Sequence, residues 1–233
     1  MSAAPTVVRT KNFVADAAAF IFEHARNALA ERNEFRIALS GGNTPAPIYA
    51  RIAAEARDFP WERVLFTFGD ERCVPPDDPQ SNFRMARENL FMPAGVPEKS
   101  IMKMRGEIYP KTAAQQYEDQ LNALAIASGE AVYRHDLILL GLGDDGHTAS
   151  LFPGTAGLEE TARGVVANFV PKLNDWRLTF TFPLIDRARH ILFLVGESKS
   201  PQLIERVIGG DQQYPAARVN PPAGEVTWMI QES

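Results

Sequence analysis

The sequence predicts an α/β fold with a mostly parallel central sheet and helices on both of its faces. Two observations support this prediction. Several short runs of the chain are apolar throughout, as strands buried on both faces of a parallel sheet are. Segments with helical spacing of apolar residues separate these runs along the sequence. Because no repeat, low-complexity tract or linker interrupts the pattern, we expect residues 1–233 to form one domain.

The predicted helices are recognised by the spacing of their apolar residues and by their first residues. In the first helix, Ala17 and Ile21 belong to an apolar stripe at three- and four-residue intervals. Pro45 suits a first helical turn, and Thr44 and Ser81 are candidate N-caps, whose hydroxyl oxygens can accept a free backbone N–H. The helices are expected at residues 16–32, 45–57, 81–91, 111–128 and 200–208.

The predicted strands are short apolar runs, several of them rich in β-branched and aromatic residues. They are expected at residues 35–39, 64–68, 137–140, 177–182 and 191–195. Three of them are followed directly by a glycine, at Gly69, Gly141 and Gly196. In open parallel sheets, ligands bind beyond the carboxyl ends of the strands, so we expect the chemistry in the segments that follow them.

Composition and charge limit the classes of protein to which this chain can belong. Of its 233 residues, 45% are hydrophobic and 23% are charged, as in ordinary globular proteins. The net charge of −5 is spread along the chain, which argues against a nucleic-acid-binding protein. The single cysteine, Cys73, excludes an intramolecular disulfide and a zinc site built on thiolates. With no secretory signal and no apolar stretch of about 18 residues, we expect a cytoplasmic protein without a membrane partner.

A glycine-rich turn follows the first predicted strand and opens a helix. Its residues are Ser40, Gly41, Gly42, Asn43 and Thr44. Glycines allow the backbone to turn tightly, so that amide N–H groups and the helix dipole converge on one point, where a phosphate could bind. Interpreted alone, these residues fit a turn without a ligand equally well.

A phosphate site at this turn needs positive charge from elsewhere in the chain. Lys199 follows the strand at 191–195, and Arg177 opens the strand at 177–182. Either side chain could be a solvated surface charge. Their places next to strand ends favour phosphate binding only modestly.

The turn after the strand at 137–140 carries a candidate catalytic pair. Residues 141–146 match the glycine pattern of dinucleotide-binding sites, but Asp144 and Asp145 stand where the pyrophosphate would lie and would repel it. We therefore reject a nucleotide site. Asp145 and His147 suggest acid–base chemistry instead, because an imidazole can take a proton from water and a carboxylate can orient it. A capping aspartate with a structural histidine is the alternative.

A divalent metal ion at the same turn is disfavoured. Asp144, Asp145 and His147 could act as ligands, but the other three histidines are scattered along the sequence rather than placed in a ligand pattern. We therefore expect no metal ion at this turn.

A second charged cluster, Asp70, Glu71 and Arg72, follows the strand at 64–68. A structural ion network and the lining of a polar pocket would account for it equally well. In a pocket, Arg72 could bind an anion or stabilise an oxyanion, and Asp70 could accept a proton or a sugar hydroxyl.

Taken together, these segments are similar to the 6-phosphogluconolactonase family. The resemblance lies in residues 39–45, in 69–72 with 81–82, and in 141–153, whose sequence GLGDDGHTASLFP is highly specific. The tail at 215–219, with Trp228 beyond it, is also similar to the family's ending. The resemblance extends from about residue 10 to residue 230.

This resemblance implies a Rossmann-like three-layer α/β sandwich, shared with glucosamine-6-phosphate deaminases. It also implies hydrolysis of the δ-lactone of 6-phosphogluconate without an organic cofactor. His147 matches the family's catalytic histidine, and Asp70, Arg72 and Asp145 match its active-site charges. The residues that fall in the superfamily's phosphate site are Ser40, Gly41, Gly42, Thr44, Arg177 and Lys199, and we expect Asn43 with them.

The mechanism that we expect begins with His147, which takes a proton from a water molecule attacking the lactone carbonyl. Asp145 or Asp70 would orient the imidazole, and Arg72 or backbone amides would stabilise the oxyanion. Residues 172–177 and Cys73 depart from the family's pattern. Whether the lysine or the arginine of this segment, Lys172 or Arg177, reaches the ligand is therefore left open.

Two other functions compete with lactone hydrolysis. An amino-sugar-phosphate deaminase or isomerase would share both turns, although residues 148–153 resemble the lactonase version and deaminases carry an Asn-Glu-Pro segment there. A non-catalytic sugar-phosphate sensor would bind its ligand without turnover. The sequence does not decide between a monomer and a weak homodimer.

Overall fold

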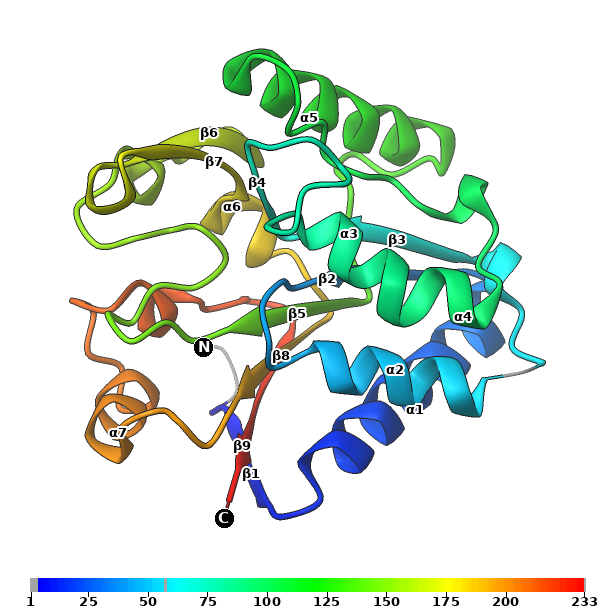
Figure 1. The fold of residues 1–233 in the computed structure, drawn as a ribbon, viewed down its shortest axis with the longest axis horizontal. Helices are drawn as coiled ribbons and strands as arrows, with labels where there is room; N and C mark the ends of the chain where they lie inside the picture. Colours follow the sequence, from blue (N-terminus) through cyan, green and yellow to red (C-terminus); the bar gives the residue numbers. More distant parts are fainter. Residues whose placement is uncertain (1–3, 57, 233) are drawn as a thin grey trace.

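The computed structural model of the chain describes residues 4–56 and 58–232. Its centre is a six-stranded sheet in which neighbouring strands run parallel. In spatial order the strands are β1 (Thr6–Thr10), β9 (Glu225–Gln231), β8 (His190–Val195), β5 (Leu137–Gly141), β2 (Phe35–Leu39) and β3 (Val64–Phe68). The predicted α/β fold with a parallel central sheet is confirmed (Figure 1).

Helices cover both faces of this sheet. Alternate residues of its strands point to opposite sides, so each strand contributes side chains to both faces. The helices are α1 (Phe13–Arg32), α2 (Ala46–Glu55), α3 (Asn82–Ala86), α4 (Met92–Ala94), α5 (Pro110–Ala127), α6 (Phe182–Ile185) and α7 (Pro201–Ile208). Leu137 and Leu139 of β5 are buried in a core with α1 and α2. Ile138 and Leu140 belong to the opposite core, with α5 and α7.

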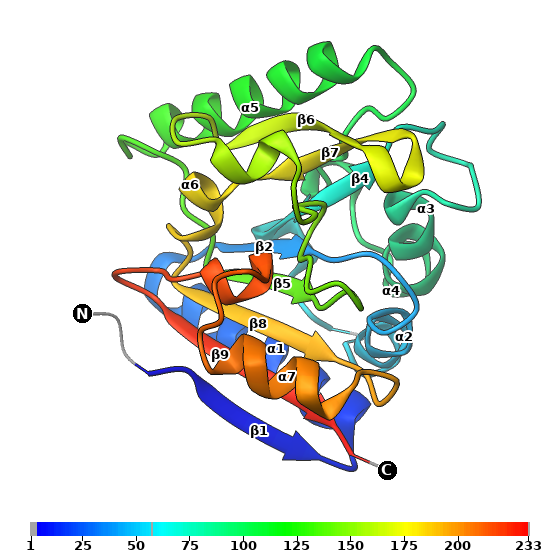
Figure 2. The ribbon, with the colours of Figure 1, turned by 90° about the vertical axis from the view of Figure 1, so that its left-hand side faces the viewer.

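A second, three-stranded antiparallel sheet lies between the central sheet and α5 (Figure 2). Its strands, in spatial order, are β4 (Asp70–Arg72), β7 (Asp175–Phe180) and β6 (Val165–Val170). The strand expected at residues 177–182 is β7, so it belongs to this sheet and not to the parallel one. It ends at Phe180 because the backbone N–H groups of Leu184 and Ile185 donate to Thr181 O and start α6.

The helix ends differ from the predictions in ways that have local causes. The N-cap of α2 is Pro45, and no side chain caps that helix, so the prediction of Thr44 as a cap is wrong. Ser81 does cap α3, because its Oγ accepts from the backbone N–H of Arg84 at 3.2 Å. The helix expected at 81–91 is divided into α3 and a π-helical turn before α4. Arg57, the expected end of the second helix, lies outside the described residues.

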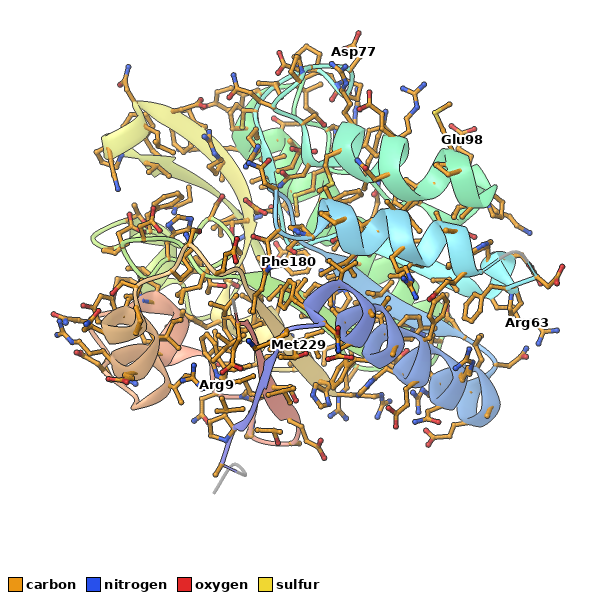
Figure 3. The ribbon with its side chains drawn as sticks, turned by 60° about the horizontal axis from the view of Figure 1, so that its bottom comes forward. Arg9, Arg63, Asp77, Glu98, Phe180 and Met229 are labelled. Carbon is orange, nitrogen blue, oxygen red and sulfur yellow. The ribbon has the colours of Figure 1, made fainter. Side chains whose placement is uncertain are left out.

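The labelled side chains of Figure 3 illustrate the surface and the interior of the molecule. Arg63, Asp77 and Glu98 lie at the periphery, whereas Phe180 and Met229 are 0% and 3% exposed. Among the helices of the described ranges, none has the length and apolar character needed to cross a membrane.

Candidate active site

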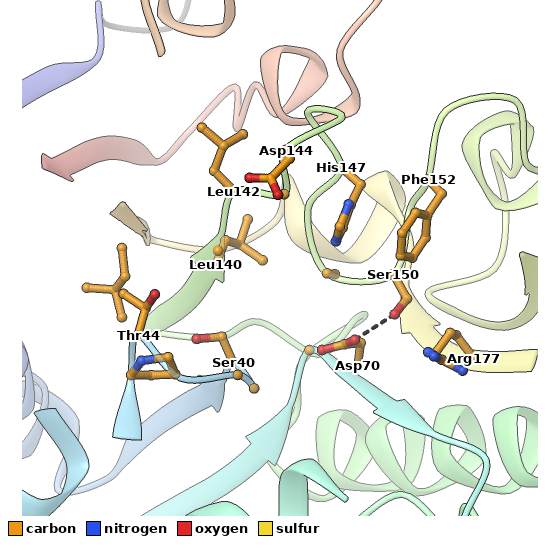
Figure 4. A pocket seen from close by; sticks show the side chains of 18 of the residues that line it. Ser40, Thr44, Asp70, Leu140, Leu142, Asp144, His147, Ser150, Phe152 and Arg177 are labelled. Atoms are coloured by element: carbon orange, nitrogen blue, oxygen red, sulfur yellow. Dashed lines mark hydrogen bonds between the residues drawn. The ribbon is translucent and has the colours of Figure 1, made fainter. Parts of the chain in front are cut away.

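One cavity of about 450 Å³ lies at the carboxyl ends of β2, β3, β5 and β8 (Figure 4). Residues from 40–45, 69–72, 139–152, 172–177 and 194–199 line it. Every residue that the sequence placed in the candidate site is among them: Ser40, Gly41, Gly42, Asn43, Thr44, Asp70, Arg72, Asp145, His147, Arg177 and Lys199. The strand ends therefore bring together residues that are far apart in the sequence, such as Ser40 and Lys199, which are 159 positions apart.

The turn after β5 holds the backbone around His147. The N–H of Gly143 donates to His147 O at 2.9 Å, and Gly146 adopts a left-handed φ of 77°. A Cβ on Gly146 would lie 2.3 Å from the ring of Tyr214, so this position has neither the conformation nor the space for a side chain. The N–H of Ala216 donates to Gly146 O at 3.0 Å and ties the turn to the C-terminal part of the chain.

Asp145 binds the His147 ring with one oxygen and Lys172 with the other. Its Oδ1 lies 2.5 Å from His147 Nδ1, and its Oδ2 accepts from Lys172 Nζ at 3.0 Å. Burial by itself would raise the pKa of Asp145, but the hydrogen bonds from His147 and Lys172 outweigh it and lower the pKa to about 2. Asp145 is therefore ionised at neutral pH. An ionised carboxylate at Nδ1 favours the tautomer protonated there, which leaves the lone pair on Nε2.

Asp70 makes its contacts with other residues than His147. Ser150 Oγ donates to Asp70 Oδ2 at 2.6 Å (Figure 4). Asn82 Nδ2 donates to Asp70 Oδ1 at 3.1 Å. In this structure the carboxylate that contacts the imidazole is thus Asp145 rather than Asp70. Ser150 and Asn82 were not predicted as site residues; they lie within the two motif segments, but their link to Asp70 is visible only in the folded chain.

Glu71 points to the other side of β4 from Asp70 and Arg72, because alternate residues of a strand point to opposite sides. Its side chain is 2% exposed and accepts from the backbone N–H groups of Asn82 and Phe83 at 2.7 and 2.8 Å. Burial raises the pKa of Glu71 although these hydrogen bonds oppose the change. Glu71 therefore fixes the start of α3, whereas Asp70 and Arg72 line the cavity.

Two arginines stand opposite each other on neighbouring strands of the small sheet. Arg72 of β4 is paired in register with Arg177 of β7, and both line the cavity. Arg72 Nη1 donates to Gln80 O at 2.6 Å, and Arg177 Nη1 donates to Trp176 O at 2.9 Å and pairs with Asp175. Like charges directly opposite each other destabilise a sheet, and an anion bound near them would offset that cost.

The segment that departs from the family's sequence pattern does reach the cavity. Residues Pro171–Leu173 form a short 3₁₀ turn, and Asn174 follows with a left-handed φ of 47° before β7 begins. This tight connection places Lys172, Leu173 and Arg177 on the cavity wall.

The turn after β2 leaves several hydrogen-bonding groups available. The Tyr49 hydroxyl accepts from Ser40 N at 3.1 Å and donates to Ser40 O at 2.9 Å, which fixes the start of the turn. Ser40 Oγ is buried and has no hydrogen-bond partner among the described residues. Within the same ranges, no hydrogen bond from the backbone N–H of Gly42, Asn43 or Thr44 is found. An anion in the cavity could accept hydrogen bonds from these groups.

Gly41 has no room for a side chain. A Cβ there would lie 1.8 Å from Oδ1 of Asn82, the residue that holds Asp70. Gly42 is a glycine for another reason, because its φ of 95° lies in the left-handed region. The glycine-rich turn and the Asp70 segment are therefore packed directly against each other.

Lys199 approaches the cavity from the loop after β8. Its Nζ donates to Asp144 Oδ1 at 2.6 Å, a contact that lowers the pKa of Asp144. A Cβ on Gly196, in the same loop, would lie 3.2 Å from Thr44 Oγ1, so this loop borders the glycine-rich turn. Lys199 and the glycine-rich turn therefore line the same cavity.

A family model described as glucosamine-6-phosphate isomerases/6-phosphogluconolactonase matches residues 9–228. The chain belongs to this family. The family expected from the sequence motifs is thereby confirmed.

Individual relatives and solved structures agree with this membership. The 6-phosphogluconolactonase of Synechocystis sp. is 43% identical over 209 residues, which cover 88% of this chain and 85% of that protein. The 6-phosphogluconolactonase of Haemophilus influenzae is 35% identical over 202 residues, which cover 84% of each chain. The crystal structure of 6-phosphogluconolactonase from Thermotoga maritima has a TM-score of 0.84 at 27% identity and covers 98% of this chain and 100% of that chain. The Rossmann-like fold is confirmed as well.

In this member of the glucosamine-6-phosphate isomerase/6-phosphogluconolactonase family, the other three histidines lie outside the cavity lining. His135 is fully buried, with Nε2 2.9 Å from Thr67 Oγ1. His24 and His190 contact each other, with 3.2 Å between their ring nitrogens. Of the described residues, no three His, Cys, Asp or Glu side chains are grouped as metal ligands.

Proposed function

We propose that this chain is a 6-phosphogluconolactonase, which hydrolyses 6-phospho-D-glucono-1,5-lactone to 6-phosphogluconate. The observation that carries the proposal is the presence of an acid–base pair, His147 with Asp145, in the same cavity as a glycine-rich turn with free donors. A substrate that carries a phosphate at one end and a hydrolysable carbonyl at the other requires both parts. The names of the relatives from Synechocystis sp. and Haemophilus influenzae support the same reaction.

In the proposed complex, the phosphate binds beside the turn after β2. The backbone N–H groups of 42–44 and Ser40 Oγ would donate hydrogen bonds to it, and Lys199 and Arg177 would supply positive charge. Lys199 would exchange its contact with the highly exposed carboxylate of Asp144 for one with the phosphate. Lys172 is assigned to Asp145 rather than to the phosphate, because its Nζ already donates to that carboxylate.

The proposed chemistry uses the free Nε2 of His147. This nitrogen takes a proton from water as the water oxygen forms a bond to the lactone carbonyl carbon. Asp145 stabilises the imidazolium, and Arg72 or backbone amides stabilise the tetrahedral oxyanion. The bond to the ring oxygen then breaks, and His147 returns the proton to that oxygen. The products are a carboxyl group and a hydroxyl group, and no organic cofactor takes part.

Asp70 has a separate place in this proposal. Its two oxygens accept from Asn82 and Ser150, so it is held firmly at the cavity wall. Asp70 would accept a hydrogen bond from a hydroxyl group of the sugar and so orient the lactone carbonyl toward His147. The proposed setting is the cytoplasm, with a small sugar-phosphate lactone as the partner and no nucleic acid or membrane. The protein would act as a monomer or weak homodimer.

Turnover of freshly generated 6-phosphogluconolactone, followed spectroscopically against a blank for spontaneous hydrolysis, tests the proposal. We expect hydrolysis well above the blank and no ammonia release from glucosamine 6-phosphate. Ammonia release without lactone turnover would instead indicate an amino-sugar-phosphate deaminase. Binding of 6-phosphogluconate without any turnover would indicate a sugar-phosphate sensor.

A further inference from the structure

The imidazole of His147 is enclosed by more than its hydrogen bond to Asp145. The ring of Phe152 stacks on it, with 3.9 Å between the ring centroids and 23° between the planes (Figure 4). Gly143 closes a second side, because a Cβ on that residue would lie 2.1 Å from Cε1 and Nδ1 of the imidazole. Asp145 occupies Nδ1. Within the described residues, Nε2 is the ring nitrogen that makes no hydrogen bond.

Hydrogen bonds hold the backbone around Phe152 in place. Its carbonyl oxygen accepts from the backbone N–H and from Oγ1 of Thr155, at 3.2 and 2.7 Å. Asn168, which is 1% exposed, donates from Nδ2 to both Thr155 Oγ1 and Ser150 O at 2.9 Å. The aromatic ring therefore rests on a fixed backbone and not on a mobile loop.

A single hydrogen bond at Nδ1 does not fix the plane of an imidazole, because the terminal torsion of histidine has a broad, shallow profile. The ring could turn about the line that joins Nδ1 to Asp145 and carry Nε2 away from the attacking water. A displacement of about 1 Å at a reacting atom can cost on the order of 100-fold in rate. A flat aromatic surface against one face of the ring opposes this rotation.

We propose that Phe152 is a positioning residue for His147. Its ring sets the plane of the imidazole and Asp145 sets the hydrogen-bonded edge, while Gly143 provides the space that this arrangement needs. Nε2 is then directed into the cavity. This inference rests on the proposed role of His147 as the base, and it adds a residue that does not touch the reacting atoms.

The kinetic test compares Phe152→Leu with Phe152→Tyr and with a matched control, Phe169→Leu. Phe169 is an aromatic residue outside the cavity lining and is 39% exposed. We expect Phe152→Leu to lower kcat by about 10- to 100-fold and to change KM by less than about twofold. Phe152→Tyr, which keeps the flat ring, should retain most of the wild-type kcat, and Phe169→Leu should match the wild type. If Phe152→Leu fails to fold, Phe152→Met takes its place with the same expectations.

A spectroscopic test works even without turnover. The chain has four histidines, so the Cε1–H resonances can be resolved by NMR, and the His147 signal is identified by its loss in His147→Asn. A stacked phenyl ring shifts this signal upfield. We expect the shift to disappear in Phe152→Leu and to persist in Phe152→Tyr and Phe169→Leu.

The two measurements separate this inference from the proposed function. An unmoved His147 resonance in Phe152→Leu, or an unchanged kcat in that variant while His147→Asn is inactive, would overturn the positioning role. If the wild-type protein does not hydrolyse the lactone at all, the proposed function fails, and the resonance still tests whether Phe152 stacks on the imidazole, because an unmoved signal in Phe152→Leu would overturn the inference.

Discussion

The two oxygens of Asp145 connect His147 to Lys172, and these two hydrogen bonds favour the ionised carboxylate. Its low pKa, about 2, means that it carries a full negative charge wherever the enzyme is expected to work. The neighbouring Asp144 differs, because it is exposed and contacts Lys199 rather than the imidazole. The two adjacent aspartates therefore belong to different parts of the candidate site.

Asp145→Asn should lower kcat by about 10²- to 10⁴-fold, because an amide can neither hold the required tautomer nor stabilise an imidazolium. Asp144→Asn is the matched control and should keep kcat close to that of the wild type. Steady-state kinetics with the lactone measure both variants. Equal losses of kcat in the two variants would contradict the division of roles between the aspartates.

Arg177 and Lys199 should act on substrate binding rather than on the chemical step. Arg177→Gln and Lys199→Gln are each expected to raise KM by about 10- to 100-fold with little change in kcat, because a charged hydrogen bond to phosphate is present in both ground and transition states. Arg206→Gln, which removes a surface arginine paired with Asp211, should leave KM unchanged. A fall in kcat at constant KM in either lining variant would place that residue in the chemical step.

The candidate site depends on the packing of the glycine-rich turn against the start of α3. Gly41 and Asn82 are the contact between them, and Asn82 also holds Asp70. The glycine-rich turn and the Asp70 carboxylate are therefore linked through one pair of adjacent residues.

Gly41→Ala should reduce the free energy of unfolding by about 1–3 kcal/mol, because its Cβ would overlap Asn82. Asn82→Ala removes the obstacle but also the two buried hydrogen bonds that Asn82 Nδ2 donates to Asp70. In the double variant we expect the loss to be smaller than the sum of the two single losses, by about 0.5 kcal/mol or more. Urea denaturation of the four proteins measures this coupling, and strictly additive losses would contradict the direct contact.

Individual elements show how far the sequence could predict the fold. The strands β2 and β3 have the predicted bounds, since apolar runs bounded by turns are a strong local signal. The strands β1, β6 and β9 were not predicted, because each mixes polar with apolar residues; β6 contains Asn168 and β9 begins at Glu225. The assignment of β7 to a second sheet depends on pairing between distant segments, which periodicity does not report.

The lining of the site could be predicted because its residues follow strand ends that meet at one edge of the sheet. Apart from Asp145, which was expected as one of two candidate partners of His147, the contacts within the site could not be predicted. Ser150 and Asp70 are 80 positions apart, and Arg72 meets Arg177 only through the register of β4 and β7.

The stability of the whole fold should decrease in mild acid through His135. Burial, together with the charge of Arg36, lowers the pKa of His135 to about 3, against about 6.5 for an unperturbed histidine. A lowered pKa means that the folded state favours the neutral ring. The contribution is therefore fully present above pH 6.5 and is lost as the pH falls toward 3.

Urea denaturation of wild-type protein and His135→Gln between pH 7 and pH 4 tests this linkage. The free energy of unfolding of the wild type should fall over this interval, and the variant, which has no titrating group at this position, should show a smaller decrease. Identical slopes would show that His135 does not contribute to acid sensitivity.

In the proposed reaction His147 takes the proton from the attacking water, so a variant that lacks the imidazole should lose turnover but not product binding. His147→Asn should lower kcat for 6-phosphogluconolactone by about 10²- to 10⁴-fold, the usual contribution of a general base. Calorimetric binding of 6-phosphogluconate to the same variant should give a Kd within about twofold of the wild type, because the phosphate-binding groups are untouched. An unchanged kcat in a folded variant that binds the product normally would contradict the claim.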